Sequence, residues 1–230
     1  MKSNTVKMNF DGHLINFDVD TASHITYLVY GGWYESLYGR GSCKYLISGC
    51  YFCPPTDPCD LDTLLAQKVE KLRYADGEVV KFVYRNVTLK VGERDISSLR
   101  VALLVGSSCT DDGVQPYALL GLSPPPLNPE AEIETPSFLK QLVKAGEIPH
   151  LAFSIHVSKF SVGIGGHMVL GGATGQANCT AIFSLVKPSW AKTAVAIAAS
   201  AVRVKRPSEN YQAMKAIRDC STQHRVSEGS

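Results

Sequence analysis

Two aspartates are the residues of this sequence best suited to acid–base chemistry. Asp20 lies in FDVDTAS (residues 17–23) and Asp219 in AIRDCST (residues 216–222), so each follows an apolar run and precedes hydroxyl side chains. Hydroxyl and backbone N–H groups can fix a carboxylate by hydrogen bonds. Two such carboxylates placed together share one proton, so the pair can activate a water as base and protonate a carbonyl oxygen as acid. Taken alone, either motif is more often a turn or a helix cap.

The segments between the two aspartates occur in a particular order. The sequence YADG (residues 74–77) has the composition of a hairpin tip and contains Tyr74, Asp76 and Gly77. The strand-like ALLGLS (118–123) follows, then a predicted helix over residues 137–145, then FSIHV (153–157) and GHMVLGG (166–172).

This ordered set resembles the pepsin-like aspartic proteases over nearly the whole chain. In that family an Asp-Thr-Gly-Ser motif comes first and a tyrosine on a flap hairpin second. An apolar strand ending in glycine, a helix, a Phe-Ser strand and a Gly-Gly turn then complete the first lobe. The resemblance implies an all-β, bilobal acid protease fold. Residues 1–180 would form the N-terminal lobe, and residues 181–230 would begin a C-terminal lobe that is incomplete after Asp219.

By the same resemblance, Asp20 and Asp219 would be the catalytic dyad of an aspartic endopeptidase that hydrolyses peptide bonds without metal or organic cofactor. Tyr74, with Asp76 and Gly77, would form the flap that closes over the substrate. Five further residues would support the site, and they are Thr21, Ser23, Tyr27, Gly121 and Thr222. Of these, Tyr27 matches an aromatic residue that bonds toward the flap, and Gly121 a glycine packed behind the first aspartate loop.

The chain departs from the family pattern at several of these positions. Ala22 stands where the family has glycine, so its Cβ is expected to crowd the loop after Asp20. Arg218 precedes Asp219, and Cys220 with Ser221 replaces the usual Thr/Ser-Gly. The strand that usually precedes the first aspartate is expected to be missing. Two alternatives therefore remain open, a catalytically inactive homologue that binds peptides or inhibitors, and a truncated fragment.

Short β-rich runs separated by Gly, Pro, Asn and Asp predict a protein made mainly of strands. The expected strands cover residues 14–19, 25–30, 79–91, 99–105, 151–157, 167–170 and 181–186. Helices are expected over residues 60–73, where leucines recur at helical spacing, and over 137–145.

Four of the seven cysteines lie within 17 residues, Cys43, Cys50, Cys53 and Cys59. Four thiolates in one loop could bind zinc, but disulfides are the favoured interpretation, and their pairing stays open. Sequons at Asn86 and Asn178 agree with a glycoprotein of the secretory pathway, extracellular or lysosome-like by family. Residues 1–10 nevertheless lack the apolar core of a secretory signal.

Composition excludes several other classes of function. The net charge of +2, from 23 basic and 21 acidic side chains, is too small and too evenly spread for a nucleic-acid binder. The apolar run 193–202 is too short to span a bilayer. The resemblance to the aspartic proteases implies a peptide or protein substrate as partner, and a monomer is the expected oligomeric state. The alternative is a homodimer in which each copy supplies Asp20, as in the single-lobe retroviral relatives.

Overall fold

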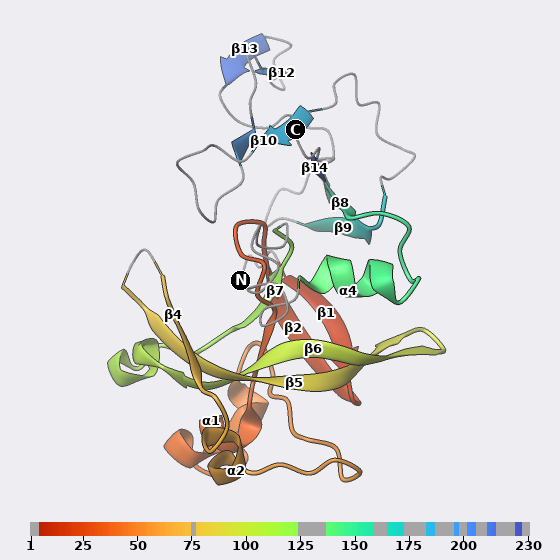
Figure 1. Ribbon diagram of the computed structural model, residues 1–230. Coiled ribbons are helices and arrows are strands. Elements are labelled where there is room, and N and C mark those ends of the chain that lie inside the picture. The colour runs from red at the N-terminus through yellow and green to blue at the C-terminus, as the bar shows by residue number, and fades with distance from the viewer. Residues whose placement is uncertain are drawn as a thin grey trace.

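The chain is built mainly of β-strands, as its sequence predicts (Figure 1). The computed structural model describes residues 5–74, 77–123, 137–158 and 165–172, and beyond these the backbone of five short strands between residues 183 and 226. Asp76, Asp219 and Thr222 lie outside the described residues.

A seven-stranded sheet carries the candidate site. Its strands, in spatial order, are β1 (Thr5–Phe10), β2 (His13–Asp20), β7 (Ala118–Gly121), β3 (Tyr27–Val29), β6 (Arg94–Ser107), β5 (Val79–Val91) and β4 (Glu70–Arg73). Because β1 also pairs with β5, through Asn9 opposite Lys90, the sheet closes on itself and leaves β4 outside the ring. The expectation that no strand precedes the one ending at Asp20 is wrong, because β1 pairs with β2 along its whole length.

The β1–β2 turn is held by a buried tyrosine. Asp11 and Gly12 both adopt positive φ angles, 49° and 89°, which the tight hairpin turn requires and which the Asp-Gly pair favours. The Asp11 carboxylate accepts a hydrogen bond from the Tyr51 hydroxyl at 2.7 Å and another from the backbone N–H of Thr88 at 3.0 Å. Tyr51 thereby ties the turn to the cysteine-rich loop, and Asp11 ties it to β5.

Replacing this tyrosine by phenylalanine is expected to destabilise the fold. Tyr51 is fully buried, and Tyr51→Phe removes a hydrogen bond to a carboxylate without removing the ring. We expect the free energy of unfolding to fall by about 2 kcal/mol, measured by urea denaturation. Tyr45→Phe is the matched control, because the Tyr45 side chain is 70% exposed. Equal stability of the two variants would contradict the role given to the Tyr51 hydroxyl.

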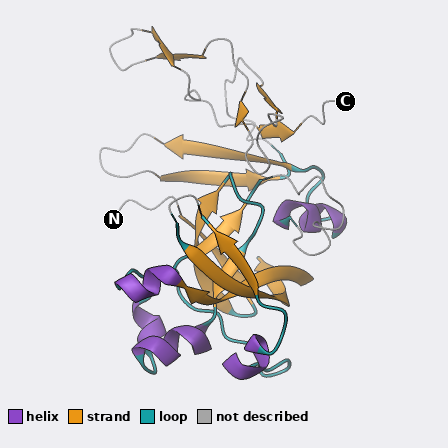
Figure 2. Ribbon diagram, turned by 60° about the vertical axis from the view of Figure 1, so that its left-hand side comes forward, coloured by secondary structure: helices purple, strands orange, loops and turns teal. Residues whose placement is uncertain are grey.

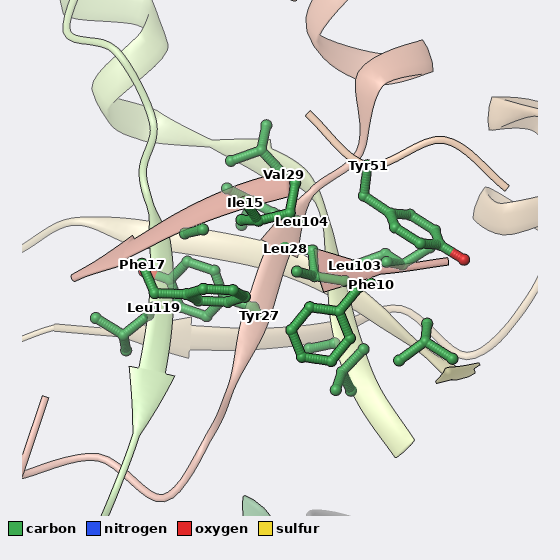
Figure 3. Close-up of a cluster of buried hydrophobic side chains, with 14 of the residues drawn as sticks. Phe10, Ile15, Phe17, Tyr27, Leu28, Val29, Tyr51, Leu103, Leu104 and Leu119 are labelled. Carbon is green, nitrogen blue, oxygen red and sulfur yellow. The ribbon is translucent and has the colours of Figure 1, made fainter. Parts of the chain in front are cut away.

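The core lies inside the closed sheet. Phe10 and Phe17 meet edge to face with ring centroids 5.6 Å apart, and Tyr27 lies close by (Figure 3). The side chains that fill this space come from strands distant in sequence, and they include Ile15, Leu28, Val29, Leu103, Leu104 and Leu119. Along β2, Ile15 and Phe17 are buried while Leu14 and Asp18 are exposed, so burial of these apolar side chains fixes the register in which Asp20 ends β2.

The helices are short and lie at the periphery of the strands (Figure 2). They are α1 (Gly31–Tyr38), α2 (Leu61–Leu65) and α4 (Phe138–Lys144), with 3-10 turns η1 (Ser42–Tyr45) and η2 (Ser108–Asp112). The helix predicted over 137–145 is confirmed by α4. The one predicted over 60–73 is wrong beyond Leu65, because Glu70–Arg73 forms β4. There Leu72 pairs with Val80 of β5, and this pairing overrides the helical spacing of the leucines.

A second sheet contains strands from both sides of residue 180. Its order is β11 (Ala196–Ile197), β10 (Phe183–Val186), β14 (His224–Val226), β8 (Ala152–Ser158) and β9 (Gly165–Leu170). A separate pair joins β12 (Val202–Lys205) to β13 (Tyr211–Met214). The division into lobes at residue 180 stays a prediction.

The cysteine-rich loop contains two disulfides, Cys43–Cys50 and Cys53–Cys59. The interpretation of these four cysteines as disulfide-bonded is confirmed, and the alternative of a zinc site is wrong. Among the described residues, no group of three or more His, Cys, Asp or Glu side chains could hold a metal ion. The loop is bonded to the ring through Tyr51, whose N–H donates to the carbonyl of Val29 at 2.9 Å, and through the Tyr30 hydroxyl, which donates to the carbonyl of Cys59 at 3.2 Å.

Candidate active site

Asp20 is the last residue of β2 and is held by the backbone that follows it. Its Oδ1 accepts a hydrogen bond from the N–H of Ala22 at 2.7 Å, and its carbonyl accepts one from the N–H of Leu122 at 2.8 Å. Strand β7 runs parallel to β2 and places Gly121 opposite Asp20. The carboxylate is partly exposed, so it is fixed by the turn and still open to a reactant.

Gly121 lies in close contact with the loop after Asp20. A Cβ at this position would come within 2.5 Å of the Ile25 carbonyl oxygen and 2.7 Å of the Ser23 carbonyl oxygen. The Gly121 N–H donates to the hydroxyl of Thr26 at 3.1 Å in buried surroundings. This contact between β7 and the loop fixes where the loop lies, and it leaves no space for a side chain.

Tyr74 lies at the start of the turn between β4 and β5. Its N–H donates to the carbonyl of Glu78 at 2.8 Å, and the N–H of Gly77, at φ 98°, donates back to the Tyr74 carbonyl at 3.1 Å. The Tyr74 hydroxyl donates to the hydroxyl of Tyr27 at 3.2 Å. The hairpin is thus bonded to the strand that follows the Asp20 loop.

The phenols around this hydrogen bond remain protonated. Burial raises the pKa of Tyr27 far above its ordinary value, and the neighbouring Tyr74 and Tyr117 raise it further. Burial also raises the pKa of Tyr74; the hydrogen bond with Tyr27 opposes this increase, and the charges of Tyr117, Asp20 and Glu78 add to it. At acid and neutral pH these groups therefore act as neutral hydrogen-bond donors and acceptors.

The residues next to Asp20 take roles that the motif alone does not specify. The Ser23 hydroxyl accepts a hydrogen bond from the N–H of Ile25 at 3.1 Å, and the Ser23 carbonyl accepts one from the N–H of Ser123 at 3.0 Å. Thr21 is exposed. Ala22 is exposed and does not adopt a positive φ, so the expected crowding by its Cβ does not occur.

Two residues that the sequence analysis did not name belong to this site. Thr26 anchors Gly121 through its hydroxyl, and the ring of Tyr117 packs against Tyr27 with centroids 6.1 Å apart. Thr26 was detectable in principle, because a threonine inside an apolar strand needs a buried hydrogen-bond partner. No local signal marks Tyr117, which reaches Tyr27 only because β7 pairs with β3.

Comparison with known proteins adds no relative. No protein-family model matches the chain, and the search of curated proteins finds no significant match. In the part of the chain that the structure describes, no helix is long and apolar enough to cross a membrane.

Proposed function

We propose that the chain is an aspartic endopeptidase whose first catalytic carboxylate is Asp20. The observation that carries the proposal is the combination of three parts: a carboxylate held at a strand end, a glycine packed against the loop that follows it, and a hairpin tyrosine bonded to Tyr27, which follows the same loop. The order of motifs along the chain indicates the same three residues, Asp20, Tyr74 and Gly121. The two disulfides agree with an oxidising, secretory compartment for this enzyme.

The proposed reaction needs a second carboxylate, which we assign to Asp219. One carboxylate of the pair removes a proton from water while the other donates a proton to the carbonyl oxygen of the scissile bond. The water oxygen adds to the carbonyl carbon, and the tetrahedral intermediate then collapses as the C–N bond breaks and the leaving amine takes up a proton. The hydrogen bond from the Ala22 N–H, which fixes the Asp20 carboxylate, supports this assignment.

Tyr74 has a positioning role in this proposal. Its neutral hydroxyl is bonded to Tyr27, so the hairpin can cover an extended peptide without placing a second negative charge beside Asp20. A substrate lying between the hairpin and Asp20 would be shielded from bulk water, which strengthens the electrostatic interactions of the dyad.

Cleavage of a peptide library by the purified chain tests the proposal. We expect hydrolysis at acid pH, within about pH 3 to 7, because a dyad that shares one proton works in that range. Asp20→Asn should abolish it. Asp18→Asn, the same chemical change two residues away on β2, is the matched control and should retain it.

Three other outcomes of these experiments would change the proposed function. No cleavage by the folded chain, combined with saturable peptide binding, would replace the enzyme by an inactive peptide-binding homologue. Activity that survives Asp20→Asn but not Asp18→Asn would show that the wrong carboxylate has been assigned. An apparent mass near twice 24.9 kDa for an active sample would indicate that two copies supply the dyad.

A further inference from the structure

Strand β4 has one free edge. In the seven-stranded sheet it lies at the end of the order, outside the closed ring, and within the described residues its backbone pairs with β5 alone (Figure 1). Every other strand of this sheet has a neighbour on both sides. An unpaired strand edge presents N–H and C=O groups to which another extended chain can bond.

The register identifies which groups face outward. Tyr74 and Glu78 form a hydrogen-bonded pair at the turn, and hydrogen-bonded pairs alternate with non-hydrogen-bonded pairs along an antiparallel ladder. Leu72 opposite Val80 is therefore also a hydrogen-bonded pair. Lys71 and Arg73 are the non-hydrogen-bonded positions, so their N–H and C=O groups point away from β5 toward the free edge.

Three basic side chains on one face of β4 and β5 form a cationic cluster, defined as Lys71, Arg73 and Lys81. All three are exposed, and Lys71 lies directly opposite Lys81 in a non-hydrogen-bonded pair, where cross-strand side chains come closest. Among the described residues no carboxylate forms a salt bridge with any of them, whereas the nearby Lys68 pairs with Glu70 at 2.8 Å. Like charges directly opposite one another destabilise a sheet, so the part of the chain that the structure describes leaves the repulsion between Lys71 and Lys81 uncompensated.

We propose that the free edge of β4 binds an acidic peptide segment that adds to the sheet as an extended strand. Backbone groups of the segment would bond to those of Lys71 and Arg73. Acidic side chains at alternate positions would share the face of the cationic cluster, because alternate residues of a strand point the same way. Lysines on an edge strand protect it against neutral and basic strands, and the same charges favour an acidic one.

Fluorescence anisotropy with a labelled octapeptide of alternating Glu and Thr tests this binding. Lys71→Gln with Lys81→Gln should weaken it about tenfold. The matched control, Lys90→Gln with Lys144→Gln, makes the same change in net charge at two exposed lysines elsewhere and should leave affinity unchanged. The same peptide N-methylated at alternate positions loses backbone donors while keeping its charge, and it should also bind about tenfold more weakly.

Three results would overturn the proposal. These are no saturable binding of the unmodified peptide, equal losses in the two double variants, and equal affinity for the N-methylated peptide. Removing the opposed lysines relieves repulsion, so the Lys71/Lys81 variant should remain folded, which far-ultraviolet circular dichroism checks. The measurement reads binding and not cleavage, so its result is independent of whether Asp20 is catalytic.

Discussion

Gly121→Ala should destabilise the protein by about 3 kcal/mol and disturb the Asp20 loop. The added Cβ would lie 2.5 Å from the Ile25 carbonyl oxygen, 2.7 Å from that of Ser23 and 2.8 Å from the carbonyl carbon of His24. All three atoms belong to backbone, so no side chain can rotate away and the loop itself must shift. Equilibrium unfolding in urea measures the loss.

Gly172→Ala provides the matched control for this substitution. Nothing lies within 4 Å of a Cβ at Gly172, and its φ lies outside the left-handed region, so we expect a change below about 0.5 kcal/mol. If Gly121→Ala were as stable as Gly172→Ala, β7 would not pack against the Asp20 loop as closely as the structure places it. Peptidase activity, where present, should fall in the Gly121 variant alone, because the loop carries the carboxylate.

Removing either disulfide should cost about 2.5 kcal/mol of unfolding free energy. The bonds Cys43–Cys50 and Cys53–Cys59 close loops with sequence separations of 7 and 6, and cross-links of this length restrict the unfolded chain by about that amount. Their loss should also loosen Tyr51, which lies between them. The paired Cys→Ser variants, compared by thermal unfolding without reductant, measure the effect.

Cys109→Ser is the control for both disulfide variants, since Cys109 belongs to neither bond. It should unfold within about 0.5 kcal/mol of the parent protein. A paired variant as stable as Cys109→Ser would mean that the hydrogen bonds of the loop suffice to hold it. Addition of reductant should then leave the parent protein unaffected as well.

The strands were predictable where an apolar run was bounded by turn residues, as for Val79–Val91. The helix predicted over residues 60–73 is wrong beyond Leu65, because leucines at helical spacing occur together with the polar–apolar–polar alternation of Lys71, Leu72 and Arg73. Pairing with β5 decided in favour of a strand. Strand β1 was not predicted, although Val6, Met8 and Phe10 alternate with polar residues as a strand requires.

The candidate site was only partly predictable, for a related reason. Asp20, Tyr74 and Gly121 could be named because each belongs to a recognisable short motif. Thr26 and Tyr117 join them through strand pairing between distant segments, which no window of sequence reveals. Ala22 fits its turn because its φ angle is not positive, and the sequence alone does not indicate that angle.

The closure of β1 onto β5, with β7 beside β2, sets an order of events during synthesis. Asp20 reaches its position only when Gly121 pairs opposite it, so about 100 further residues must emerge after Asp20 itself, which takes roughly 5 to 20 s at ordinary rates of translation. The cysteines of residues 43–59 emerge well before that time. The disulfide-bonded loop can therefore form first, and the carboxylate is assembled into its site among the last parts of the ring.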